Sequence, residues 1–271
     1  MIDPGLRQPE ITTLSEGQEN IFKGQWPERI LPQVNRAELH SFYTDGAWAQ
    51  ALVFAGGGYT KLVYDKEGTE VASWLNGLGI DAHILIHRLP GADAGNGTPH
   101  PADIALGDAM AALDFLYTTE KTLPLFHVGL SSGGHLAGVM TCQQHELMAR
   151  GALIAYASLN ANHRDHKYPA GKPDYPPVQK QDFYDKWPVG LADYPHAMPK
   201  VPVFVAYALH DRTVPVQHAL RLIESAAANE LDVDAHIFSD APHGFALRDT
   251  HGTHAAWPDL AADWLRRKAL S

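Results

Sequence analysis

Short apolar runs alternate with helix-patterned segments along most of this 271-residue chain. Continuous apolar runs are typical of strands buried on both faces, and apolar residues at helical spacing are typical of helices packed on a sheet. This alternation predicts an α/β fold, with a mainly parallel sheet flanked by helices. The expected strands cover residues 37–43, 50–54, 80–87, 125–128, 151–157, 201–207 and 233–238, and the expected helices cover 67–78, 101–117, 135–148, 216–229 and 254–268.

Two stretches interrupt this alternation. Residues 1–36 are polar and proline-containing, and we expect an extended N-terminal arm over the domain or a partner subunit. Residues 158–199 hold seven prolines and several aromatic residues. A loop of this length in a compact domain is usually functional, so we expect a lid or pocket wall. Neither a repeat nor a linker divides the chain, and residues 1–271 are expected to form a single domain.

Composition narrows the classes of function. Hydrophobic residues make up 45% and charged residues 19%, as in a folded globular protein. The formal net charge of -10 argues against a nucleic-acid partner, and we expect it to disfavour acidic substrates slightly. No apolar run is long enough to span a membrane, and no signal peptide is recognisable. A cytoplasmic location is therefore expected, and the single cysteine, Cys142, excludes an intrachain disulfide.

A Gly-x-Ser-x-Gly pattern at residues 129–133 lies between an expected strand and an expected helix, with Ser131 at its centre. In that context the pattern is typical of a nucleophile elbow, because a strained turn lifts the serine clear of the sheet. The flanking glycines leave room for it, and the helix N-terminus favours negative charge above it. The plainer interpretation is a glycine-rich turn without catalysis.

Asp211 and His243 also follow expected strands, so both should emerge on the same sheet edge as Ser131. The chain order Ser, Asp, His is typical of serine hydrolases with this topology. The candidate catalytic triad is Ser131 as nucleophile, His243 as general base and Asp211 as the acid that holds the imidazole. Other acids compete with Asp211 for the last role, namely Asp240, Asp182, Asp185 and Asp193.

Three glycines, Gly56 to Gly58, follow the strand at 50–54. They predict an oxyanion loop, so the amides of Gly57, Gly58 and Ser132 are the expected oxyanion hole. A simple loop is the plainer alternative. A phosphate-binding loop is disfavoured because no Gly-Lys-Ser/Thr follows.

The chain has 16 histidines, and two pairs have the spacing of metal ligands, His163 with His166 and His251 with His254. Neither pair is accompanied by cysteine or by a cluster of carboxylates. We therefore expect ordinary surface or core histidines, with no metal and no cofactor.

These motifs resemble the esterases of the α/β-hydrolase superfamily, and most closely the small carbohydrate acetylesterases, or acetylxylan esterase-like proteins. The resemblance covers about residues 50–250 and rests on the segments 56–59, 66–68, 74–79, 133–137 and 243–245, together with Asp211. It implies an α/β-hydrolase fold and a serine esterase that cleaves short-chain, mainly acetyl, esters through an acyl-enzyme. Acetylated sugars are the favoured small-molecule substrates.

Candidates for the substrate pocket are Tyr59, beside the glycine loop, and Tyr184 and Trp187, in the aromatic stretch. A lactonase or thioesterase with the same fold is an alternative. A serine peptidase of this fold is expected to carry a propeller or large cap, for which 271 residues leave no room. A catalytically inactive binding protein is the alternative from another class. No membrane partner is expected, and homo-oligomer formation is left open.

Overall fold

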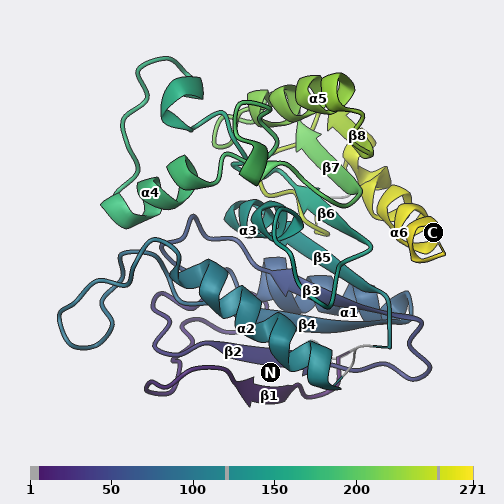
Figure 1. Cartoon of the computed structure of the whole chain (residues 1–271). Helices are drawn as coiled ribbons and strands as arrows, with labels where there is room; N and C mark the ends of the chain where they lie inside the picture. Colours follow the sequence, from purple (N-terminus) through teal and green to yellow (C-terminus); the bar gives the residue numbers. More distant parts are fainter. Residues whose placement is uncertain (1–5, 120–121, 249–250, 271) are drawn as a thin grey trace.

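A single eight-stranded sheet forms the centre of the molecule in the computed structural model, which describes residues 6–119, 122–248 and 251–270 (Figure 1). Its strand order is β1-β2-β4-β3-β5-β6-β7-β8. The pairs β1–β2 and β2–β4 are antiparallel, and every later neighbour pair is parallel. The strands are β1 (Glu10–Thr13), β2 (Glu38–Phe42), β3 (Ala49–Phe54), β4 (Ile80–Ile86), β5 (Leu125–Leu130), β6 (Gly151–Ala155), β7 (Val203–Ala208) and β8 (Val233–Phe238).

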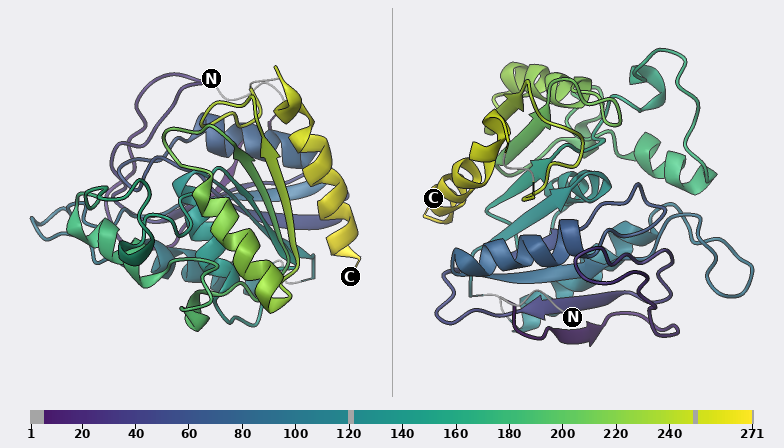
Figure 2. Two further views of the ribbon diagram at one scale, coloured as in Figure 1. Left: turned by 90° about the horizontal axis from the view of Figure 1, so that it is seen from above. Right: turned by 180° about the vertical axis from the view of Figure 1, so that it is seen from behind.

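Helices cover both faces of this sheet (Figure 2). One face packs against α1 (Glu70–Gly77) and α6 (Trp257–Ala269). The other packs against α2 (Ile104–Thr119), α3 (Ser132–Thr141) and α5 (Gln217–Asn229). Every residue of the central strands is therefore buried, which explains why these strands are apolar without alternation. The expected α/β fold is confirmed.

Some elements differ locally from those expected from the sequence. The arm at residues 1–36 contributes the edge strand β1, which pairs with β2. The expected helix at 135–148 ends at Thr141 and begins at Ser132. A π-helical turn, Asp65–Thr69, precedes α1. Arg29 Nη2 donates a hydrogen bond to Oδ1 of Asp65, the first residue of this turn, at 2.7 Å. This ion pair, with a buried carboxylate, links the arm to the turn.

Residues 158–199 contain α4 (Val178–Lys186) and two short 3₁₀ turns. Phe183 and Tyr184 of α4 are buried against the core. Asn160 anchors the start of the stretch, because its backbone amide donates to Nδ1 of His218 on α5 at 3.0 Å. The stretch is thus packed onto the domain near the sheet edge where β5 ends (Figure 1). None of the helices in the described ranges is long and apolar enough to cross a membrane.

Candidate active site

Ser131 lies in a sharp turn between the end of β5 and the start of α3. Its backbone has φ 52° and ψ -124°, in the left-handed region that a serine rarely adopts. The glycines on either side make this turn sterically feasible. A Cβ on Gly133 would lie 2.0 Å from the carbonyl oxygen of Phe54, and one on Gly129 would lie 2.3 Å from the carbonyl oxygen of Gly133. The Gly-x-Ser-x-Gly pattern is therefore a packing requirement of this elbow.

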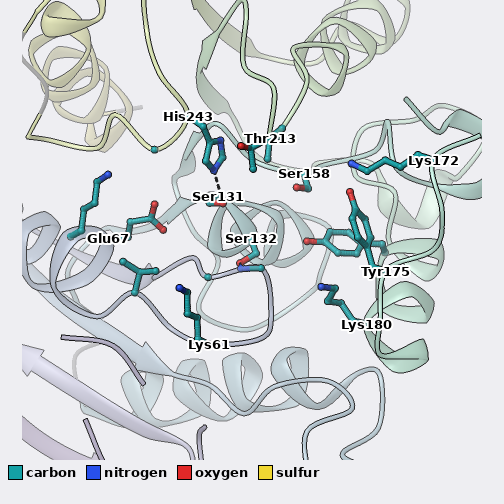
Figure 3. Close-up of a pocket in the computed structure, with 17 residues that line it drawn as sticks. Lys61, Glu67, Ser131, Ser132, Ser158, Lys172, Tyr175, Lys180, Thr213 and His243 are labelled. Carbon is teal, nitrogen blue, oxygen red and sulfur yellow. Dashed lines mark hydrogen bonds between the residues drawn. The ribbon is translucent and has the colours of Figure 1, made fainter. Parts of the chain in front are cut away.

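The three residues of the candidate triad are joined by hydrogen bonds. Ser131 Oγ lies 3.4 Å from His243 Nε2 (Figure 3), and His243 Nδ1 lies 2.7 Å from Asp211 Oδ2. The first distance still leaves Nε2 within reach of the serine hydroxyl proton. Oδ1 of Asp211 accepts the backbone amides of Thr213 and Val214 at 2.8 and 2.9 Å, so the carboxylate is fixed in place. No hydrogen bond in the described structure joins His243 to any of the competing acids.

A buried carboxyl group, Glu67, connects the glycine loop to the neighbourhood of His243. Glu67 Oε2 accepts the amide of Gly56 at 2.9 Å, and the hydroxyl of Tyr156 donates to Oε1 at 3.3 Å. The ring of Tyr156 meets the ring of His243 edge-on, with centroids 5.3 Å apart. Burial raises the pKa of Glu67, while the nearby His243 opposes that shift. The sequence places Glu67 at the start of the expected helix 67–78 and in the segment 66–68 of the family resemblance, but nothing local in it indicates these long-range contacts.

Gly57, Gly58 and Ser132 are the residues whose amides are expected to form the oxyanion hole. All three line one cavity above Ser131. The amide of Gly58 donates to Ser132 Oγ at 2.8 Å. That amide is therefore engaged by a side chain in this structure. The N-terminus of α3 also lies here, and its dipole favours negative charge above Ser131.

The cavity above Ser131 has a volume of about 490 Å³, which suits a small-molecule ligand (Figure 3). Residues 158–199 form one of its walls. That wall supplies Ser158, Lys172, Tyr175, Lys180 and Tyr184. The opposite side is formed largely by the glycine loop and its continuation, with Lys61, Val63, Lys66 and Glu67.

Of the three residues expected in the substrate pocket, only Tyr184 lines this cavity. The structure corrects the expectation for Tyr59 and Trp187. Tyr59 is buried beneath the site, where its hydroxyl lies 3.0 Å from Nδ1 of His135 and its ring packs against Tyr184. The backbone carbonyl of Trp187 lies 2.9 Å from the other ring nitrogen of His135. Both residues support the pocket wall from behind.

Within the described residues, no group of three or more His, Cys, Asp and Glu side chains is arranged to hold a metal ion. His163 and His166 stand 6.0 Å apart between ring centroids, but no third ligand joins them. His254 is buried, and its Nδ1 lies 2.8 Å from the carbonyl oxygen of Asp240. The described contacts of His163, His166 and His254 are therefore with neighbouring protein groups and do not form a metal-binding cluster.

Comparison with known proteins places these features in context. The sequence profile of the prolyl oligopeptidase family matches residues 96–269, which is more than half of the chain. The acetylxylan esterase of Xylanibacter ruminicola is 23% identical over 244 residues, covering 85% of this chain and 48% of the esterase. The chain therefore spans about half the length of this curated relative.

Solved structures have the same fold at low sequence identity. The acetyl ester-xyloside bifunctional hydrolase of Caldicellulosiruptor lactoaceticus superposes with a TM-score of 0.66 at 21% identity, over 98% of each chain. The carboxylesterase Cest-2923 of Lactobacillus plantarum superposes with a TM-score of 0.68 at 18% identity, over 97% of this chain and 98% of the carboxylesterase. Both likenesses show a shared fold.

Proposed function

This chain belongs to the prolyl oligopeptidase family and has the α/β-hydrolase fold, and we propose that it is a serine hydrolase of carboxylic esters with short acyl groups, mainly acetyl. One observation carries the proposal. Ser131, His243 and Asp211 form a hydrogen-bonded series at the end of three different strands, and the series opens into a cavity of about 490 Å³. An activated serine at a small cavity is the arrangement that acyl transfer requires.

In the proposed mechanism Ser131 Oγ attacks the ester carbonyl while His243 Nε2 accepts its proton. Asp211 keeps the imidazole in the tautomer that presents an unprotonated Nε2 to the serine, and it stabilises the imidazolium. The amides of Gly57 and Ser132 hold the oxyanion, joined by Gly58 once the Ser132 hydroxyl turns. His243 then protonates the leaving alcohol. Water attacks the acyl-enzyme by the same route, with His243 again as the base.

The proposed acetyl specificity rests on the size of the cavity and on the names of two similar proteins, an acetylxylan esterase and an acetyl ester-xyloside hydrolase. Acetylated sugars are the substrate class that agrees with the cavity size and with the names of these two proteins. A lactonase, a thioesterase and an inactive binding protein are the alternatives that the test must separate. A cytoplasmic location remains a prediction, supported by the single cysteine, which is buried.

The test is hydrolysis of p-nitrophenyl acetate by the wild-type chain and by Ser131→Ala. We expect measurable kcat for the wild type and a loss of at least about 10³-fold in the variant, because the nucleophile is gone. Ser158→Ala is the matched control, since Ser158 lines the same cavity without contacting His243 in the described structure. Equal activity in Ser131→Ala, with its fold intact by circular dichroism, would remove Ser131 from the mechanism. Turnover of a prolyl peptide but of no ester would favour a peptidase.

A further inference from the structure

The cavity above Ser131 is lined by basic side chains although the chain as a whole has a net charge of -10. Four lysines contribute to it, and among the described lining residues Glu67 is the only carboxyl group. Glu67 is buried, is bonded to the Gly56 amide and lies within electrostatic reach of Lys66. The other three lysines are Lys61, Lys172 and Lys180.

Lys172 and Lys180 come from the same wall of the cavity and flank one aromatic ring. Their Nζ atoms lie 4.9 and 5.2 Å from the centroid of Tyr175. Figure 3 shows the three side chains together on one side of Ser131, with Glu67 on the other side. Both ammonium groups thus pack against the same ring, in the wall of the cavity.

Neither ammonium group makes an ion pair or hydrogen bond with a described residue, although their neighbours do. Lys167, five positions before Lys172, is paired with Asp174. Lys180 is buried as a residue, and it lines the cavity, so its side chain is packed against protein while its charge has no counterion among the described residues. Burial lowers the pKa of both lysines, and the nearby Lys167 adds to this for Lys172. An anion bound in the cavity beside them would offset the cost of holding these charges against protein.

We propose that the ester substrate carries an anionic group, a carboxylate or a phosphate, and that Lys172 and Lys180 bind this group while Ser131 attacks the acyl carbon. The inference rests on the proposed ester hydrolysis and narrows its substrate to acetyl esters of acidic or phosphorylated sugars. It also reverses the expectation drawn from net charge. The overall charge of -10 is spread over the chain, whereas the local field in the cavity comes from its own lysines.

The decisive comparison uses three acetyl esters of one sugar: a neutral methyl glucoside, the corresponding glucuronic acid and the corresponding 6-phosphate. Acetate release gives kcat/KM for each. We expect at least one anionic ester to exceed the neutral ester by about tenfold or more, chiefly through a lower KM, because a charged contact fixes the ground state and the transition state alike. The advantage should shrink as salt is added. The anionic ester with the higher kcat/KM shows whether the lysines prefer a carboxylate or a phosphate.

Variants locate the contact. In Lys172→Gln/Lys180→Gln the ratio of anionic to neutral kcat/KM should fall towards one, and Lys180→Arg should retain most of the preference. Lys200→Gln removes one positive charge, as Lys172→Gln does, and is the control for that single variant, since Lys200 is exposed and precedes β7, at the opposite edge of the sheet from the cavity. It should keep the wild-type ratio. Lys172→Gln alone replaces a half-buried residue and gives the test if the double variant does not fold.

Two outcomes overturn the inference while leaving the esterase in place. One is a wild type that hydrolyses the neutral ester as fast as both anionic esters. The other is a preference that survives in the double lysine variant. If no ester is hydrolysed, the proposed function fails, and calorimetry with Ser131→Ala decides on the anion site separately. Binding of glucuronate or glucose 6-phosphate that is lost in the lysine variants supports the site, and absence of binding refutes it.

Discussion

Asp211 Oδ2 lies 2.7 Å from His243 Nδ1, while its other oxygen, Oδ1, is held by the amides of Thr213 and Val214. The carboxylate therefore has one oxygen fixed by the backbone and one directed at the imidazole. Its side chain is fully buried, so water does not compete for the contact. This arrangement leaves Nε2 of His243 as the atom that faces Ser131.

Asp211→Asn should lower kcat by about 10³- to 10⁴-fold with little change in KM, because the amide stabilises the wrong tautomer of His243. Steady-state kinetics with p-nitrophenyl acetate measure both constants. Asp240→Asn, which alters the nearest competing acid in the chain, should behave as the wild type does. The reverse pattern would assign the acid to Asp240 and leave Ser131 and His243 in their roles.

Glu67→Gln should stabilise the protein increasingly as pH rises above about 4.5, the ordinary pKa of a glutamate. Burial raises the pKa of Glu67, so the folded protein holds a proton that the unfolded chain has already released. The contribution of Glu67 to wild-type stability therefore falls as pH rises from about 4.5 to the pKa of Glu67 in the folded protein, and the variant escapes this loss. Melting temperatures of the two proteins from pH 4 to pH 8 test this. A constant difference between them across this range would contradict the account.

The wild-type protein should lose stability as pH falls below about 6.5. Burial lowers the pKa of His83 and His135 to about 4 and that of His127 to about 3. Below 6.5 the unfolded chain binds protons that the folded protein excludes, at about 1.4 kcal/mol per pH unit for each histidine. Chemical denaturation from pH 7 to pH 5 measures the slope. His127→Gln should reduce it, and an unchanged slope would mean that His127 is charged in the folded state.

Hydrolysis of p-nitrophenyl esters should slow as the acyl chain grows from acetate to decanoate. The cavity of about 490 Å³ is walled on one side by residues 158–199, and a long acyl chain would compete with the alcohol part of the ester for this limited volume. The quantity to compare is kcat/KM across the series. A steady rise with chain length would point to a lipid-binding groove instead.

The sequence predicted the features that depend on local patterns and on the rule that parallel strands end at one edge. The strand 233–238 matches β8 residue for residue, and Ser131, Asp211 and His243 meet as expected. Their positions follow from chain order alone, because each comes after a strand of the parallel part of the sheet.

Features that depend on long-range packing could not be predicted in this way. The pairing of β1 with β2 involves an exposed edge strand without a strong apolar pattern. The packing of Lys172 and Lys180 against Tyr175 depends on how a proline-rich stretch folds back over the site, which no periodicity encodes. Tyr59 was misplaced for a related reason. Its position beside the glycine loop was correct, but its side chain turns inward to His135.

The most direct test of the central claim is to trap the acyl-enzyme. Wild-type protein mixed with p-nitrophenyl acetate and quenched in acid within its first turnovers should carry one acetyl group, and peptide mapping by mass spectrometry should place it on Ser131. The same group should be absent from Ser131→Ala. An acetyl group found reproducibly on another residue, or ester turnover in which a fluorophosphonate leaves Ser131 unlabelled, would contradict the proposed nucleophile.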